Sequence, residues 1–280
     1  MRRFAKAYVE ITNICNLDCG FCHKTKRSPR SMSADEFKAV ISRLSGHTDY
    51  IYFHLLGEPL LHPELEAMLG MAADAGFNCC ITTNGFLLRE RAQALRKAKQ
   101  LYKLSVSLHS FEANSVPVKL EEYLEAVWEQ CSYLAMQGTI CVLRLWNEGG
   151  ESALNGEIID FLRRKTQRPW EEKRPGSLRL CENVCLENAA RFQWPDLAAQ
   201  ESGTQFCRGL RDQIAVLCDG TLVPCCLDAD GELALGNLLE KPLEELLDGE
   251  RARLIYDGFS RRAPREELCR RCGYAARFNR

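Results

Sequence analysis

Short apolar segments alternate with longer helix-like segments over the first two-thirds of the chain, and this alternation restricts the fold more than any other feature. The expected strands are residues 8–11, 49–55, 78–82, 103–108, 139–146 and 178–184. The expected helices are residues 34–45, 63–75, 87–99, 119–136 and 152–166. Short strands separated by helices indicate parallel βαβ units, because a parallel neighbour needs a long crossover connection. We therefore expect an α/β fold, a partial (β/α)6 barrel of the TIM type that six strands leave incomplete.

Local signals support the ends of these helices. Ser33 is followed three residues later by Glu36, which is the pattern of a capping box. Pro63 begins the next helix and Gly76 follows it, the usual order of proline at the start and glycine at the end. In barrels of parallel strands, functional residues lie at the carboxyl ends of the strands. The segment after each strand is therefore where we expect chemistry.

A dense group of cysteines follows the first expected strand. Cys15, Cys19 and Cys22 have the spacing C-x3-C-x2-C, directly after the apolar segment that ends at Ile11. Three thiolates so close in sequence can bind three irons of a cubane iron–sulfur cluster and leave the fourth iron without a protein ligand. An open iron is a place for chemistry, whereas four protein ligands indicate an electron carrier. The sequence therefore predicts a reactive [4Fe–4S] site at the end of the first strand.

The pattern changes near residue 186. Two short strand-like segments, 213–217 and 221–224, flank Asp219-Gly220, and Asp-Gly between apolar runs is a strong hairpin signal. A helix is expected at 242–256. We expect a barrel domain over residues 1–190 and a small α+β domain with a β-hairpin over residues 191–280.

The second expected domain contains its own cysteine set. Cys207 precedes the hairpin, Cys225 ends it, and Cys269 and Cys272 form a C-x2-C pair near the end of the chain. Four thiolates make a closed site that suits a fully ligated [4Fe–4S] cluster or a structural zinc. The spacing does not separate these two alternatives.

Taken together, these motifs resemble the radical SAM superfamily. In that family the open iron chelates the amino and carboxylate groups of S-adenosylmethionine (SAM), and one electron from the cluster cleaves SAM to a 5′-deoxyadenosyl radical. The tail resembles the auxiliary-cluster domain of many such enzymes, in its shortened single-cluster form (twitch) rather than the longer SPASM form. The resemblance covers about residues 8–275 and favours a second [4Fe–4S] cluster over zinc.

The resemblance also implies a set of SAM-binding residues. Gly57 and Glu58 follow the second strand in a segment similar to the family's GGEP motif, with Leu56 in place of the first glycine. Arg144 on the fifth strand lines the substrate space or approaches the SAM carboxylate, because an unpaired buried guanidinium would be costly. The complete cofactor-binding set is Phe21, Gly57, Glu58, Pro59, Thr83, Ser107 and Arg144.

Few residues stand out as catalytic groups. His109 and Glu182, expected at the ends of the fourth and sixth strands, are weak candidates for a base, and a structural role is the alternative for each. Four further cysteines lie near the domain junction, and one of them could be a catalytic thiol, although buried cysteines more often act as small apolar residues. They are Cys181, Cys185, Cys218 and Cys226.

Composition excludes several classes of protein. Fifteen cysteines in 280 residues indicate metal binding in a reducing compartment, because a chain of this length can build a core without cross-links. The net charge of −1 gives no basis for binding nucleic acid. No apolar run reaches the roughly 18 residues of a membrane span, and the basic start has no signal-peptide core. We expect a cytoplasmic protein with no membrane or nucleic-acid partner.

The function that the resemblance implies is radical chemistry on a substrate inside the barrel. A flavodoxin or ferredoxin would reduce the SAM cluster, and the second cluster would assist a net oxidation. The chain has no room for a leader-binding domain, which favours a small or sugar-like substrate. A peptide-modifying maturase is the alternative, since a separate protein can bind the leader. A non-catalytic iron–sulfur or zinc scaffold is the second alternative, but it would have no use for Gly57 and Glu58.

Overall fold

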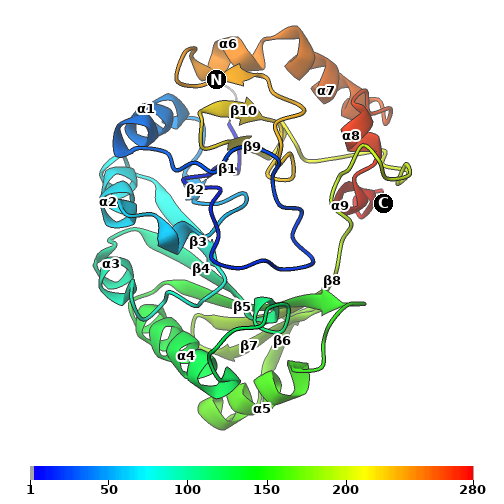
Figure 1. Ribbon diagram of the computed structural model, residues 1–280. Helices are drawn as coiled ribbons and strands as arrows, with labels where there is room; N and C mark the ends of the chain where they lie inside the picture. Colours follow the sequence, from blue (N-terminus) through cyan, green and yellow to red (C-terminus); the bar gives the residue numbers. More distant parts are fainter. Residues whose placement is uncertain (1–2, 280) are drawn as a thin grey trace.

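The computed structural model describes residues 3–279 and is built on one large sheet (Figure 1). The strands are β1 (Lys6–Val9), β2 (Tyr50–Tyr52), β3 (Asn78–Thr83), β4 (Leu101–Ser107), β5 (Ile140–Glu148), β6 (Glu171–Arg174), β7 (Ser177–Cys181), β8 (Val184–Ala190), β9 (Gln213–Val216), β10 (Thr221–Val223) and β11 (Gly236–Asn237). The helices are α1 (Ala34–Leu44), α2 (Leu65–Asp74), α3 (Ala92–Lys97), α4 (Leu120–Met136), α5 (Asn155–Thr166), α6 (Leu243–Leu247), α7 (Glu250–Ser260), α8 (Glu267–Arg270) and α9 (Gly273–Ala276), with short 3-10 turns η1 (Pro59–Leu61) and η2 (Leu108–Ser110).

The strand order is β11-β10-β9-β1-β2-β3-β4-β5-β8-β7-β6. The run from β1 through β5 to β8 is parallel throughout. Figure 1 shows these strands curving into an open barrel, with α1 to α5 along its outer side. This confirms the expected α/β fold, a partial barrel followed by a C-terminal part with antiparallel strands.

The two faces of the parallel strands have different surroundings. Ala7 and Val9 of β1 belong to the large apolar core, which also contains the buried side chains of α1 and α2. Tyr8, between them, belongs to a separate inner cluster with Leu55 and Ala215. Successive residues of a strand point to opposite faces. The even-numbered residues of β1 therefore face the inside of the barrel.

The sixth barrel strand differs from the expected one. Residues 178–184 span the end of β7, a turn, and the first residue of β8. β7 is antiparallel to β8, and β8 is the strand that continues the parallel barrel beside β5. Asn183 has a left-handed backbone, φ 58°, which asparagine tolerates better than most residues. This turn divides one apolar run into two strands.

The expected hairpin is present as β9 and β10, with Gly220 at φ 86° in its turn. It is not separate from the barrel, because β9 pairs in parallel with β1 and so extends the barrel sheet. The helix expected at 242–256 is divided into α6 and α7 at Gly249. The boundary between residues 190 and 191 stays a prediction.

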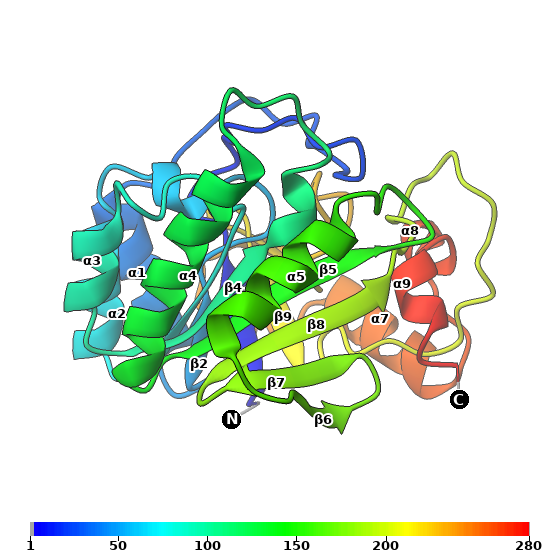
Figure 2. The same ribbon diagram turned by 90° about the horizontal axis from the view of Figure 1, so that it is seen from below.

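The loops that follow β1 and β4 lie on one side of the sheet, as Figure 2 shows. They are in contact there, because Asn114 accepts a hydrogen bond from the Asp18 backbone N–H at 2.8 Å. This side holds the carboxyl ends of the strands, where the chemistry was expected. None of the helices in residues 3–279 combines the length and apolarity needed to cross a bilayer.

Candidate active site

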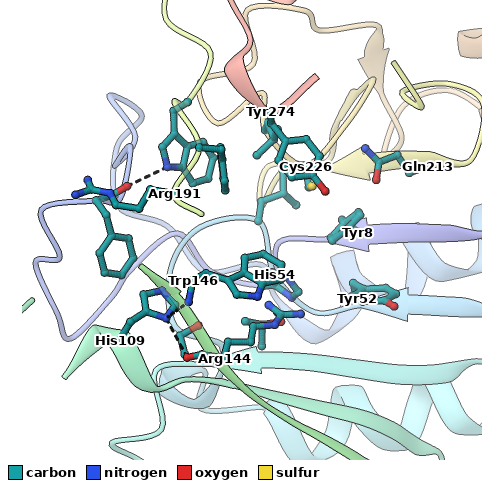
Figure 3. A pocket seen from close by; sticks show the side chains of 17 residues that line it. Tyr8, Tyr52, His54, His109, Arg144, Trp146, Arg191, Gln213, Cys226 and Tyr274 are labelled. Atoms are coloured by element: carbon teal, nitrogen blue, oxygen red, sulfur yellow. Dashed lines mark hydrogen bonds between the residues drawn. The ribbon is translucent and has the colours of Figure 1, made fainter. Parts of the chain in front are cut away.

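A cavity of about 240 Å³ lies inside the open barrel (Figure 3). Tyr8, Tyr52 and Arg144 reach it from β1, β2 and β5. Cys226 and Tyr274 reach it from the C-terminal part of the chain. The cavity is therefore enclosed jointly by the barrel and by the segment that carries the second cysteine set.

The three cysteines of the first motif lie in the loop after β1, beside this cavity. Phe21, between Cys19 and Cys22, lines the cavity. Cys15 is exposed, Cys19 is buried and Cys22 is half-buried. Asn114 donates a hydrogen bond from Nδ2 to the Sγ of Cys19 at 3.1 Å. The loop thus reaches the cavity through Phe21.

The electrostatics of these thiols fit a metal cluster. Partial desolvation by the surrounding protein, together with the negative charges of Glu58, Cys19 and Cys22, raises the pKa of Cys15 to about 11. Burial also raises the pKa values of Cys19 and Cys22. Thiolates crowded in this way need a positive partner, and metal binding deprotonates such ligands. The donor set is that of three corners of a cubane cluster.

The second cysteine set also converges. Burial raises the pKa of Cys225 well above its ordinary value, and the charges of Cys207, Cys272 and Cys269 contribute. Cys272 packs in one apolar cluster with Cys207 and Cys225. In residues 3–279, no three His, Cys, Asp or Glu side chains gather tightly enough to hold a single metal ion. In a cubane, by contrast, each cysteine bonds to a different iron.

Gly57 and Glu58 join the loop after β2 to the cysteine loop. Gly57 has φ 72°, and a Cβ there would lie 2.3 Å from the Thr12 carbonyl oxygen. The Glu58 N–H donates to the Ile14 carbonyl at 2.9 Å. Only glycine allows this close approach without strain. The segment therefore fixes where the cysteine loop begins.

The Glu58 carboxylate is buried under these loops. It accepts backbone N–H bonds from Asn84 at 2.8 Å and from Leu60 at 3.0 Å. Burial raises its pKa to about 7, and these hydrogen bonds oppose that shift. Pro59 begins η1 directly after it. The carboxylate thus ties the ends of β2 and β3 together, and contact with SAM stays a prediction for this segment.

Of the two threonines at the end of β3, the one that lines the cavity is Thr82 and not Thr83, which was expected to bind the cofactor. Thr82 lines the cavity, whereas Thr83 pairs with Val106 of the outer core. The Thr83 hydroxyl accepts a hydrogen bond from Gly85 N–H at 3.0 Å. Because neighbouring strand residues face opposite sides, only one of the two threonines can point inward.

Ser107, at the end of β4, and His109, in η2, both line the cavity. The His109 ring lies 4.8 Å from the Phe21 ring. Its Nδ1 lies 3.1 Å from the Arg144 carbonyl oxygen and 3.4 Å from the Trp146 N–H. The nearer partner is a carbonyl, which can only accept, so we assign the proton to Nδ1 and the free lone pair to Nε2. Burial lowers the pKa of His109, which keeps the ring neutral.

Arg144 extends into the cavity with few partners of its own. Its Nη1 donates a long hydrogen bond to the Thr82 hydroxyl at 3.4 Å, and its guanidinium lies 4.5 Å from the Trp146 ring centroid. The buried Nε has no hydrogen-bond partner within residues 3–279. Burial lowers the pKa of Arg144.

Glu182 lies away from the site. It is exposed in the β7–β8 turn, close to Val184, which pairs with Cys141 near the start of β5. It is therefore at the amino end of β8, opposite the end that carries the cysteine loop. The expected position failed because the strand boundary was wrong.

Sequence reasoning missed several residues that line the cavity. Tyr8, Tyr52 and His54 lie inside the barrel, and their rings pack against one another at 5.0 to 6.0 Å. The sequence did contain a signal for them. Side chains alternate between the two faces along β1 and along the segment from β2 to His54, and these aromatic groups occupy the inward positions. Cys226, which the sequence had named as one of four junction cysteines, lines the cavity and hydrogen-bonds the Tyr8 hydroxyl.

The C-terminal part also holds the cysteine loop in place. Trp194 donates from Nε1 to the Phe21 carbonyl at 3.0 Å. Asp230 accepts hydrogen bonds from the Thr25 hydroxyl at 2.9 Å and from the Lys26 N–H at 2.8 Å. The two cysteine-bearing segments therefore form one connected structure around the cavity.

Comparison with protein families gives two matches. The radical SAM superfamily model matches residues 9–129, and the SPASM iron–sulfur cluster-binding domain matches residues 207–273. The cavity residues Phe21 and Cys226 come from these two regions. These two domains imply SAM, a SAM-binding [4Fe–4S] cluster and auxiliary clusters.

Curated relatives match mainly the first region. A probable GTP 3′,8-cyclase of Pyrobaculum aerophilum is 31% identical over 114 residues, which is 39% of this chain and 36% of the relative. An S-adenosylmethionine-dependent nucleotide dehydratase of Selenomonas ruminantium is 35% identical over 85 residues, 30% of this chain and 31% of the relative. The aligned region thus spans about a third of each relative.

Solved structures match along almost the whole chain. BtrN in complex with AdoMet and 2-DOIA has a TM-score of 0.64 at 20% identity and covers 97% of this chain and 94% of its own. Streptococcus suis SuiB bound to S-adenosylmethionine has a TM-score of 0.61 at 16% identity, covering 97% and 70%. These similarities show a shared fold. The two family matches therefore identify a radical SAM domain over residues 9–129 and a SPASM iron–sulfur cluster-binding domain over residues 207–273, and residues of both line one barrel cavity.

Proposed function

We propose that the protein is a radical SAM oxidoreductase that oxidises a small substrate held in the barrel cavity. The observation that carries this proposal is the composition of the cavity wall. Phe21 of the cysteine loop and Cys226, adjacent to the second cysteine set, line the same space. A substrate there would lie between the two expected clusters.

Two groups of side chains would hold the cofactors. Cys15, Cys19 and Cys22 would hold the SAM cluster, with Phe21 and Ser107 on the SAM side of the cavity. The auxiliary cluster would be held by Cys207, Cys225, Cys269 and Cys272. When bound, these cofactors supply a 5′-deoxyadenosyl radical and an acceptor for one electron. A flavodoxin or ferredoxin is the electron donor that we propose.

The chain itself supplies enclosure and proton transfer. Phe21, Trp194 and Tyr274 cover the cavity with aromatic rings, which would exclude water from a radical reaction. Oxidation of an alcohol to a carbonyl removes one hydrogen atom, one proton and one electron. His109 is neutral, lines the cavity and has a free Nε2 lone pair, so we propose that it accepts the proton.

Two observations support a small substrate. The cavity volume of about 240 Å³ lies below the range of about 300–1,000 Å³ typical of ligand pockets. BtrN, which binds the small molecule 2-DOIA, matches this chain along almost its full length, and two curated relatives are named for reactions on nucleotides. A peptide-modifying function is the second candidate, because SuiB bound to its precursor peptide SuiA has the same fold with a TM-score of 0.55.

The first prediction concerns SAM cleavage. Anaerobically reconstituted protein should contain about eight iron atoms per chain and should form 5′-deoxyadenosine when reduced with dithionite in the presence of SAM. Changing Cys15, Cys19 and Cys22 together to Ala should abolish this product and leave about four iron atoms. A triple variant that still forms 5′-deoxyadenosine would refute the proposal. Cys79→Ala, in the buried core, is the matched control and should retain both iron and product.

A further inference from the structure

The Arg144 guanidinium is the charged group of the cavity wall that is most shielded from water, since the other one, Arg191, is exposed. It carries five N–H donors. Among residues 3–279, its only side-chain hydrogen bond is the 3.4 Å contact to Thr82, and its buried Nε has no partner. Leaving a buried charge unpaired is strongly unfavourable. The cavity is therefore built to receive an acceptor that the described part of the protein does not provide.

The surrounding charges have the same sign. The cavity wall contains Arg144 and Arg191 and includes no aspartate or glutamate among the described residues. Lys6 and Lys103 are close enough for their positive charges, together with that of Arg144, to lower the pKa of His54. The carboxylate that acts most strongly on Arg144 is Glu187, which already pairs with Arg174 at 2.8 Å. The interior thus has a surplus of positive charge.

A second unsatisfied group lies beside Arg144. The Nδ1 of His54 is buried and has no hydrogen-bond partner in the part of the chain that the structure describes. Burial lowers the pKa of His54 to about 3, so the ring is neutral and can present an N–H. Figure 3 shows the Arg144 side chain directed toward His54 and the two tyrosines Tyr8 and Tyr52. Two buried nitrogens without hydrogen-bond partners, Arg144 Nε and His54 Nδ1, therefore lie in one part of the cavity.

This place is distinct from the surroundings of the cysteine loop. The charged groups that act on the loop thiols are Asp18, Lys24 and Glu58. The titratable groups that act on Arg144 are Glu187 and the tyrosines Tyr8, Tyr52 and Tyr274. The guanidinium is thus on the side of the cavity nearer β1, β2 and the C-terminal segment, and its contact with SAM stays a prediction.

We propose that the substrate carries an oxyanion, a phosphate or a carboxylate, and that Arg144 binds this group inside the barrel with His54 as a second donor. A guanidinium stacked on Trp146 presents its edge to two oxygens at once, which suits either anion. The aromatic wall favours a planar ring in the rest of the substrate. The inference rests on the proposed function, because it assigns the substrate class of the same cavity.

The test uses calorimetric titration of the anaerobic, two-cluster protein saturated with SAM. The probes are phenyl phosphate, benzoate and the neutral benzyl alcohol. The wild type should bind at least one of the anions about tenfold or more tightly than benzyl alcohol. Preference for phenyl phosphate would identify a phosphate substrate, and preference for benzoate a carboxylate.

Substitutions then test whether Arg144 is the residue that binds the anion. Arg144→Gln should weaken anion binding about tenfold to a hundredfold and leave benzyl alcohol binding unchanged, while Arg144→Lys should restore part of the loss. Arg164→Gln, on the exposed surface of α5, is the matched control and should behave as wild type. Melting temperature and bound iron verify that each variant is folded.

Three results would overturn the inference. They are equal binding of benzyl alcohol and the anions, no anion binding at all, and an Arg144→Gln variant that loses SAM affinity while it keeps anion affinity. The preference of the wild-type protein for anions over benzyl alcohol is decisive by itself. The inference can therefore be tested even if a variant does not fold. Formation of 5′-deoxyadenosine is measured separately, so failure of the proposed function is distinguishable from failure of anion binding.

Discussion

At the scale of single residues, Gly57 shows how one backbone conformation positions a reactive loop. Its φ of 72° and the 2.3 Å that would separate an alanine Cβ from the Thr12 carbonyl oxygen are independent reasons for glycine. Gly76 has φ 83°, but a Cβ there would meet no atom of the described residues within 4 Å. Comparing substitutions at these two glycines therefore distinguishes the energetic cost of backbone strain from that of steric overlap.

We expect Gly57→Ala to lower the free energy of unfolding by about 2–3 kcal/mol, and Gly76→Ala by about 1 kcal/mol. Urea denaturation of the metal-free protein under reducing conditions measures both. Gly57→Ala should also lose iron from the first cluster, since Thr12 leads into the cysteine loop, whereas Gly76→Ala should not. Equal effects of the two substitutions would show that the close approach is unimportant.

At the scale of elements, the C-terminal segment helps to hold the cysteine loop through Asp230. The Asp230 carboxylate accepts bonds from Thr25 and Lys26 and lies 3.4 Å from His23. Asp230 is far from His23, Thr25 and Lys26 in the sequence, and it contacts them directly after the cysteine motif. Loss of this carboxylate should leave the loop less ordered while the strands persist.

We expect Asp230→Ala to release the iron of the first cluster about tenfold faster during exposure to a chelator, because a buried carboxylate with several hydrogen bonds contributes more than about 1 kcal/mol. The chelation rate of the reconstituted protein, followed by absorbance, measures this. Asp196→Ala is the control, since Asp196 caps its own turn through the Ala198 N–H. Identical rates in both variants would contradict a supporting role for Asp230.

At the scale of the whole molecule, the hairpin makes the two cysteine-bearing regions cooperative. β9 pairs with β1 along Lys6 to Val9, so the sheet of the barrel continues into the C-terminal part. A closed metal site couples binding to folding. Loss of the second cluster should therefore weaken the barrel as well as the segment that binds the cluster.

We expect Cys269→Ser with Cys272→Ser to lower the melting temperature of the reconstituted protein and to keep a single calorimetric transition. The shift should be about 4 °C or more, given a loss of a few kcal/mol in a chain of this size. Cys131→Ser, in the buried core of α4, controls for simple loss of a thiol. Two separate transitions would show that residues 191–280 unfold independently.

The sequence by itself determined the family, the alternation of strands and helices, and both cysteine sets. These are local properties, because they depend on residues that are close together in the sequence. Examples are the spacing of Cys15, Cys19 and Cys22 and the period of each strand. Ser107, named from the sequence for its place at the end of the fourth strand, lines the cavity.

Only the tertiary structure decided which groups share the cavity. Because of the turn at Asn183, Glu182 lies at the opposite end of the barrel. Thr82 lies on the inward face of β3 and lines the cavity, whereas Thr83 does not. Tyr8, His54, Arg144 and Tyr274 meet although they are far apart in sequence. The reason is physical: the net charge inside a barrel depends on side chains from all of its strands. A pattern of neighbouring residues in the sequence therefore does not show whether a buried guanidinium has an acceptor.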